Sequence, residues 1–252
     1  MRNAKALFFK QFQSLLRNPG MIVQAALFLV LVIIMMFLIV DDSNIDCESC
    51  IPAYVCTRCI KDNVPLDTPN PSLAGLFTVM FVGFAMVGSA SALVLEDKTT
   101  KNLRFMAMAD VKPWQYLLGT VVSMTAVALG LLVLYAIVGR YFGMQMLWFM
   151  AATGSGAIVS ILLGLVVGSS KAPGLTTLFS LVLGLGPMLS SFNEALARIL
   201  RFTYTQQVNL AISDLNGEMA SNFIIIGANG VVILLIFIWM HRKGVLGNGN
   251  TF

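Results

Sequence analysis

YFGMQMLWFMAATGSGAIVSILLGLVVGSS, residues 141–170, contains no charged side chain. As a helix this stretch would be about 45 Å long, and about 20 apolar residues already cross the hydrocarbon core of a bilayer. Backbone N–H and C=O groups in lipid must be hydrogen-bonded within their own segment, so an uncharged run of this length is expected to be helical. The stretch therefore predicts an integral membrane protein.

Five further uncharged stretches are long enough to span a membrane, namely 18–40, 68–95, 113–139, 172–193 and 219–240. The composition agrees, because 58% of the 252 residues are hydrophobic and 11% are charged, whereas soluble domains carry about 25% charged residues. The short alternating segments of a membrane β-barrel do not occur. The first run is too long for the apolar region of a signal peptide and is interpreted as a retained span. We expect an all-α membrane protein with six transmembrane helices in a single domain, 1–252.

Residues 1–17 read MRNAKALFFKQFQSLLR, in which apolar side chains recur near helical spacing between basic and polar ones. This pattern is typical of an amphipathic helix that lies in the membrane interface. Asn18-Pro19-Gly20 then breaks the helix and turns the chain into the bilayer. A positively charged leader that only sets the topology is the alternative interpretation.

The lysines and arginines predict the orientation of the spans. With the N-terminus inside, eleven of them lie in inner segments and five in outer ones, as the positive-inside rule requires. This assignment gives the inner side a net charge of +8 and the outer side −4. We expect a multi-pass plasma-membrane protein with both termini in the cytoplasm, whose basic inner side contacts anionic lipid and not nucleic acid.

Two outer segments follow from this orientation. Residues 41–72 hold all four cysteines in two C-x-x-C pairs, Cys47 with Cys50 and Cys56 with Cys59. Such pairs can hold zinc, but disulfides persist outside the cell, and free thiols are a third interpretation; in each case the cysteines brace an outer loop. The second segment, 192–218, is mildly polar and could dip into the membrane if protein shields its backbone.

Gly164 and Gly168 form a G-x-x-x-G pattern within the stretch 141–170. This spacing favours a close approach of two helices, because small residues let their backbones meet. We expect the pattern to serve packing inside the chain rather than a seam between two copies.

Several kinds of chemistry have no sequence motif here. The phosphate-binding pattern G-x-x-x-x-G-K-[ST] does not occur. No predicted span carries an ionisable residue near its centre, although ion-coupled transporters usually need one. No nucleophile–base pair is recognisable within the spans. The chain is therefore expected to be no enzyme and to receive its energy from a partner.

The remaining candidate for contact with a partner is the inner stretch from Glu96 to Gly119, EDKTTKNLRFMAMADVKPWQYLLG. Leu103 and Met106 are three residues apart and would share one face of a helix. A short surface helix with an apolar stripe is thus predicted, and Pro113 suits the first turn of the next helix. The alternative is an ordinary positively charged loop.

This stretch resembles the segment after the second span in ABC-2-type permeases, the membrane subunits of ATP-binding-cassette exporters. The residues that carry the resemblance are Glu96, Lys101-x-Leu103-Arg104 and Lys112-Pro113-x-x-Tyr116-Leu117-Leu118-Gly119. The interfacial helix, the six spans, the inner termini and the dipping outer segment are similar too. The chain departs from the family at Thr99-Thr100, where Gly-Thr is common, at Asp110, where proline is common, and in its cysteine-rich loop.

The resemblance implies a type-II ABC exporter-like fold, in which this permease faces a second copy or a homologous permease. Each would sit on a separate ATPase subunit that binds ATP and Mg²⁺, so this chain would hold no cofactor, apart from possible zinc at the cysteines. Residues 96–113 would include the coupling helix, which seats in a cleft of the ATPase. The residues implied for that contact are Glu96, Lys101, Leu103, Arg104, Phe105 and Met106.

The predicted function is the permease half of an ATP-driven exporter. Fifteen methionines and seventeen phenylalanines favour an adaptable apolar path, which suits an amphipathic or hydrophobic substrate such as an antimicrobial peptide, a drug or a lipid. The alternative is a non-transporting membrane sensor or scaffold whose cysteine-rich loop binds a ligand or a metal.

Overall fold

The computed structural model describes residues 71–100, 113–138, 143–169, 173–190, 194–213 and 219–242, together with Gln13 and Val30. Within these ranges every regular element is a helix. Nearly all of the predicted interfacial helix 1–17 and of the predicted span 18–40 lies outside the described residues, as do the four cysteines.

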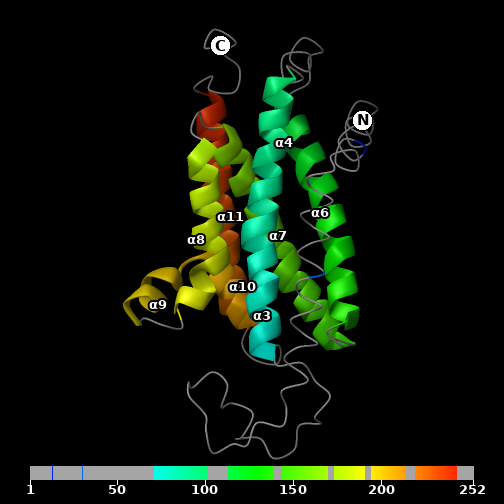
Figure 1. Cartoon of the computed structure of the whole chain (residues 1–252), viewed down its shortest axis with the longest axis vertical. Helices are drawn as coiled ribbons and strands as arrows, with labels where there is room; N and C mark the ends of the chain where they lie inside the picture. Colours follow the sequence, from blue (N-terminus) through cyan, green and yellow to red (C-terminus); the bar gives the residue numbers. More distant parts are fainter. Residues whose placement is uncertain are drawn as a thin grey trace, which may run out of the picture.

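The helices form a bundle of long, roughly aligned rods with two short helices at one end (Figure 1). The first rod is continuous through three elements, because the π-helix η3 joins α3 to α4 without a break. The elements are α3 (Pro71–Met80), η3 (Phe81–Met86), α4 (Val87–Thr99), α6 (Pro113–Val138), α7 (Met144–Ser169), α8 (Pro173–Ser190), α9 (Glu194–Leu200), α10 (Tyr204–Ser213) and α11 (Met219–Arg242).

Four of the described helices are long and apolar enough to cross a membrane, which confirms the predicted multi-pass class. They are Gly75–Thr99, Trp114–Ile137, Met144–Ser169 and Met219–Met240. The predicted span 172–193 corresponds to α8, whose apolar part, Thr176–Ser190, is shorter than these four. The count of six spans remains a prediction, because it also depends on residues 18–40.

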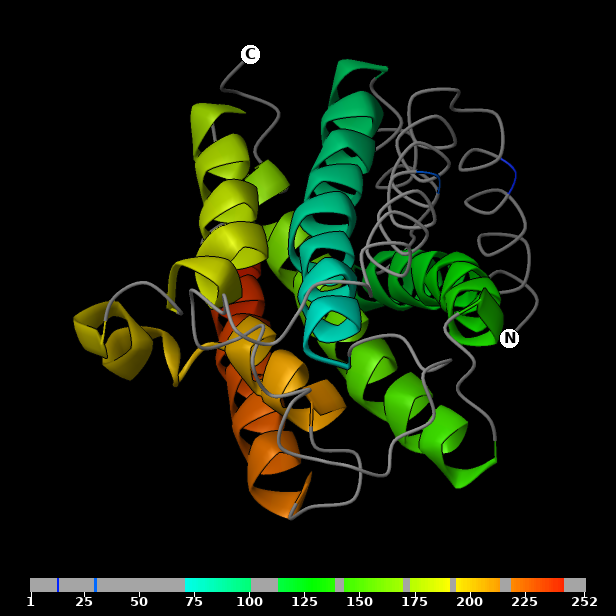
Figure 2. The same ribbon diagram turned by 60° about the horizontal axis from the view of Figure 1, so that its bottom comes forward.

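The bundle has two ends. We call the one where α4 ends and α6 begins the Lys98 end, and the one where α3 begins and α10 lies the α10 end (Figures 1 and 2). Trp114 and Trp239 are exposed at the Lys98 end, and Trp148 is exposed toward the α10 end. Tryptophan is enriched at both membrane interfaces, and the helix from Trp148 to Ser169 is about 32 Å long. The bundle thus has the height of a bilayer core.

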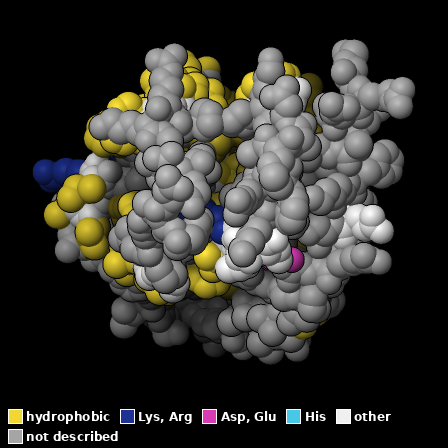
Figure 3. Space-filling view, turned by 90° about the horizontal axis from the view of Figure 1, so that it is seen from above, with side chains coloured by type: hydrophobic (Ala, Val, Ile, Leu, Met, Phe, Trp, Pro, Cys, Tyr) yellow, Lys and Arg dark blue, Asp and Glu magenta, His cyan; other side chains and the backbone are white. Residues whose placement is uncertain are grey.

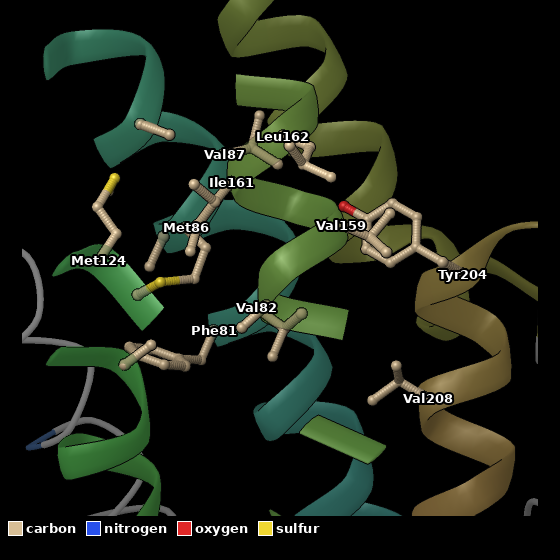
Figure 4. Close-up of a cluster of buried hydrophobic side chains, with 14 of the residues drawn as sticks. Phe81, Val82, Met86, Val87, Met124, Val159, Ile161, Leu162, Tyr204 and Val208 are labelled. Carbon is tan, nitrogen blue, oxygen red and sulfur yellow. The ribbon is translucent and has the colours of Figure 1, made fainter. Parts of the chain in front are cut away.

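Helix α7 occupies the centre of the described bundle. It contacts α4, η3, α6, α8, α10 and α11. Within an apolar stretch of 18 residues, 67% of α7 is buried, whereas the corresponding share for α11 is 17%. Apolar side chains from η3, α4, α6, α7 and α10 meet around it (Figure 4). Helices α6 and α11 keep long apolar faces that no other described part of the chain covers. Apolar faces of this kind are suited to contact with lipid.

The G-x-x-x-G pattern lies at the contact between α4 and α7. A Cβ atom added to Gly164 would lie 2.6 Å from both Ala90 Cβ and the carbonyl oxygen of Val87. One added to Gly168 would lie 2.7 Å from Ser91 Cα. The expectation that these glycines serve packing inside the chain is confirmed.

Helix α4 is longer than the sequence predicts. The span was expected to end at Leu95 and the inner segment to open at Glu96, but α4 continues to Thr99. Charged side chains mark the edge of the hydrocarbon, and a helical backbone need not stop there. The helix ends instead where the carbonyl of Glu96 accepts hydrogen bonds from the hydroxyls of Thr99 and Thr100, at 2.9 and 2.8 Å.

Residues 192–218, expected on the outer side, contain α9 and α10. Helix α9 projects from the side of the bundle in both ribbon views (Figures 1 and 2). Helix α10 contacts α3, α7, α8 and α11, and Val208 on it is fully buried. The segment is therefore part of the helix packing and not only a surface connection.

Candidate functional site

The polar junction at the Lys98 end is the candidate site, because it joins the helices on either side of the stretch that carries the family resemblance. Helix α4 ends here, α6 begins and α7 ends. Figure 3 looks onto this end, where basic and acidic side chains appear among apolar ones. Three side chains build the junction, namely Asp97 and Lys98 on the last turn of α4 and Tyr116 on the first turn of α6.

Lys98 caps a helix that is distant in sequence. Its Nζ donates to the carbonyl oxygens of Gly168 at 3.1 Å and of Ser169 at 2.6 Å, which are the last two residues of α7. The final carbonyls of a helix have no partner within it, and the helix dipole makes this end negative. A cation there contributes about 0.3–2 kcal/mol, so Lys98 stabilises the end of α7 from α4.

Asp97 ties α4 to α6. Its side chain is 6% exposed, and its Oδ2 accepts a hydrogen bond of 2.8 Å from the Tyr116 hydroxyl. Hydrogen bonds to a charged group contribute about 1.5–3 kcal/mol. Because Asp97 and Lys98 are adjacent, one turn of α4 is held to the start of α6 and to the end of α7.

The structure describes one residue of the predicted partner-binding set, and it lies next to the junction in the sequence. Glu96 lies on the last turn of α4 and is half-buried. The other five residues, Lys101, Leu103, Arg104, Phe105 and Met106, lie outside the described residues. The structure therefore places the two helices that flank the predicted coupling segment, and its contact with a partner remains a prediction.

No sequence motif groups Asp97, Lys98 and Tyr116. In the sequence Asp97 and Lys98 count only as charges at the inner end of a span, and Tyr116 belongs to the motif that carries the family resemblance. The available signal was a carboxylate next to a lysine at the edge of a span, where each charge needs a partner if the helix continues past the apolar run.

A second set of polar contacts lies where α9 gives way to α10. Ser160 of α7 donates to the Tyr204 hydroxyl at 2.8 Å. Asn229 of α11 donates to the carbonyl of Phe202 at 3.0 Å. Side chains thus satisfy the backbone where it leaves helical geometry. The carbonyls that accept from side chains here are those of Leu200, Arg201 and Phe202.

Neither set of contacts is arranged for bond-breaking chemistry. Among the described residues no group of three or more His, Cys, Asp or Glu could hold a metal ion, and the cysteines lie outside those residues. The contacts join helices to one another. They can hold the helices of the bundle together and transmit a movement of one helix to the next.

The fold and this junction define a multi-pass, all-helical membrane component. The family model described as "ABC-2 family transporter protein" matches residues 61–239, which is more than half of the chain. The chain belongs to this family, as the sequence resemblance predicted. It is thus the membrane component of an ABC transporter rather than its ATPase, and the family implies an ABC ATPase subunit as its partner. No curated protein and no solved structure matches the chain significantly.

Proposed function

We propose that the chain is the permease subunit of an ATP-driven exporter whose Lys98 end faces the cytoplasm and the ATPase. The observation that supports this most is the junction of Asp97, Lys98 and Tyr116. It lies at the two ends of the predicted coupling-helix segment, residues 96–113, and joins three long helices there. A segment that is held in this way can pass force from a cytoplasmic partner into the bundle.

The charges of the described helices support an external energy source. In Gly75–Thr99 the only charged residues are Glu96, Asp97 and Lys98 at one end, and the other three spanning helices contain none. A proton or ion relay needs an ionisable group within the membrane. The ATPase partner implied by the family supplies the energy instead.

We further propose that residues 192–218 re-enter the membrane from the α10 end. A Cβ atom added to Gly156 would lie 2.6 Å from Val208 Cγ2, and Gly156 is about 12 Å along α7 from the exposed Trp148. Ser160, the partner of Tyr204, is about 18 Å from Trp148. The turn before α10 would then lie near mid-membrane, where irregular backbone is tolerated only when protein shields it.

An amphipathic or hydrophobic substrate fits this arrangement. At the proposed depth the chain exposes Ile199 and Phe202 next to Arg198 and Arg201, so apolar and cationic groups stand side by side. Arginine within a membrane usually faces a polar cavity or reaches for the interface. Such a surface suits a drug, an antimicrobial peptide or a lipid better than a free sugar.

Co-purification with an ABC ATPase subunit from the same organism, followed by reconstitution into liposomes, tests the proposal. We expect ATP-dependent movement of a rhodamine dye or of a phospholipid labelled with nitrobenzoxadiazole away from the side that carries the ATPase. Replacing Phe105→Asp and Met106→Asp together should abolish ATPase binding, because two charges would enter an apolar contact.

The matched control for this double variant is Phe105→Leu with Met106→Leu, which keeps an apolar stripe and should bind the ATPase. Both variants should insert into the membrane and elute as the wild type does in size-exclusion chromatography. Full ATPase binding by the aspartate variant would contradict the coupling-helix assignment. Failure of the wild-type chain to bind any ABC ATPase would contradict the proposed function as a whole.

We propose that Cys47, Cys50, Cys56 and Cys59 brace the outer loop through two disulfides. Intact-mass measurement under denaturing conditions should show a gain of two hydrogens per bridge on reduction. A mass that does not change on reduction would contradict this pairing. Release of one zinc ion per chain, measured with a chromogenic chelator, would then establish the alternative metal site.

A further inference from the structure

We infer that Lys98 is a positioning residue that passes displacement of the 101–112 segment from α4 into α7. The inference rests on the proposed function, because it assumes an ATPase that moves this segment. It adds a named residue and a direction of transmission.

Helices α4 and α6 are continuous with residues 101–112 in the chain, whereas α7 is not. Residues 101–112 are joined by the chain to α4 and α6, so a pull on the segment reaches these two helices directly. Helix α7 has no such link, since it enters from the α10 end and leaves through residues 170–172. It can respond to the segment only through side chains and packing.

Two kinds of contact join α4 to α7 at the Lys98 end, namely close packing at Gly168 and the hydrogen bonds of Lys98. Helices α4 and α7 meet closely at Gly168, where an added Cβ would lie 2.7 Å from Ser91 Cα and 2.9 Å from the Ser91 carbonyl oxygen. This close packing resists compression, and dispersion between the packed atoms also opposes separation. The bonds from Lys98 to the carbonyls of Gly168 and Ser169 add a directional link between the final turns of both helices.

Helix α7 connects the Lys98 end to α10 and α11. At the Lys98 end it is held by Lys98, and farther along it packs against Val208 of α10 and hydrogen-bonds to Tyr204. It also contacts α11. A shift of α7 therefore arrives at the turn that we place near mid-membrane. Because packed interfaces shift between discrete arrangements, a small movement at Lys98 can be passed on as a change of packing.

The test follows deuterium uptake in the complex with the ATPase, with and without trapping by ATP and vanadate. In the wild-type complex we expect trapping to change uptake in the first turns of α6 and in the last turns of α7. In Lys98→Met the change in α6 should persist, whereas the nucleotide-dependent change in α7 should be lost. Uptake is compared only for Lys98→Met chains that co-purify with the ATPase, so that a lost response in α7 does not reflect a lost partner.

A residue that only caps α7 would behave differently. Its loss would raise uptake in α7 equally with and without nucleotide and leave the nucleotide-dependent difference intact, and that result would overturn the inference. Lys98→Arg keeps charge and donors and should restore the response. Lys98→Gln, which keeps an N–H donor without the charge, serves if the methionine variant does not fold, and it should give an intermediate response.

The two proposals can fail separately. If the wild-type chain binds no ATPase, the proposed function fails, and so does the transmission inferred from it. If the ATPase binds and α7 of Lys98→Met still responds to nucleotide as the wild type does, only the role of Lys98 is wrong. For the chain alone, Lys98→Met should raise uptake in residues 165–169, and unchanged uptake there would show that the capping contact itself is absent.

Discussion

A leucine in place of Gly168 should prevent α4 and α7 from packing and should leave little folded protein after extraction in mild detergent. A Cβ at this position would meet Ser91 Cα at 2.7 Å and the Ser91 carbonyl oxygen at 2.9 Å, and backbone atoms cannot rotate away as a side chain can. Overpacking a core costs about 1–3 kcal/mol even where side chains adjust. Here whole helices must separate, whereas folded proteins in general are stable by only about 5–15 kcal/mol.

Gly130→Leu is the matched control, because no atom lies within 4 Å of a Cβ added to Gly130 on α6. Leucine has a higher helix propensity than glycine by about 0.8 kcal/mol, so this variant should melt at or above the wild-type temperature. Fluorescence-detected size-exclusion chromatography after graded heating compares the two. Equal melting of Gly168→Leu and the wild type would show that α4 and α7 do not meet closely.

The spanning helices could be predicted because lipid leaves the backbone few options. Stretches 113–139, 141–170 and 219–240 correspond to α6, α7 and α11 with ends shifted by a few residues. An uncharged run of this length must satisfy its own backbone, and the helix does so locally. The glycine pattern in α7 could be interpreted for a separate reason, because small residues at that spacing let two helices make close contact.

The polar junction could not be predicted, because its partners are far apart in sequence. Lys98 hydrogen-bonds to residues 70 and 71 positions away, and no local periodicity reports such a pair. Helix α4 extends past the predicted end of the span for a related reason. A charge at Glu96 marks where lipid ends, whereas the helix continues to Thr99, and the hydroxyls of Thr99 and Thr100 donate to the Glu96 carbonyl in its last turn.

The amino-acid sequence contains no pattern that predicts the π-helix η3. Its residues, FVGFAM, are apolar and suit an ordinary helix. The structure supplies a contact at this place, because a Cβ added to Gly83 would lie 2.9 Å from the backbone nitrogen of Gly184 on α8. Two glycines meeting across helices allow α8 to cross η3 closely, and π-helical turns often accompany functional sites.

Helix α10 was hidden by its composition. Thr205, Gln206, Gln207 and Asn209 make YTQQVNLAIS look like a surface segment, yet Thr205 and Gln207 are almost fully buried. In a membrane bundle such side chains can serve the backbone, as Gln207 does by donating to the carbonyl of Arg201. Polarity alone therefore does not distinguish an exposed loop from a re-entrant helix.

Aspartate substitutions along α10 should reveal its depth. Val208→Asp should abolish dye transport and folding, because Val208 is fully buried and an unpaired charge in a dry core costs several kcal/mol. Leu210 is 40% exposed, so Leu210→Asp reports what surrounds the helix. In lipid this charge should cost up to about 3 kcal/mol and reduce the yield of folded protein, whereas in water it should be harmless.

Ser213→Asp is the matched control, since Ser213 is exposed at the far end of the same helix, about 5 Å farther along it than Leu210. We expect the damage to decrease from Val208 through Leu210 to Ser213. Equal tolerance of aspartate at 210 and 213 would place α10 in water and contradict the re-entrant assignment. Equal damage at all three would mean that α10 is covered along its whole length, by a second copy or by a part of this chain outside the described residues.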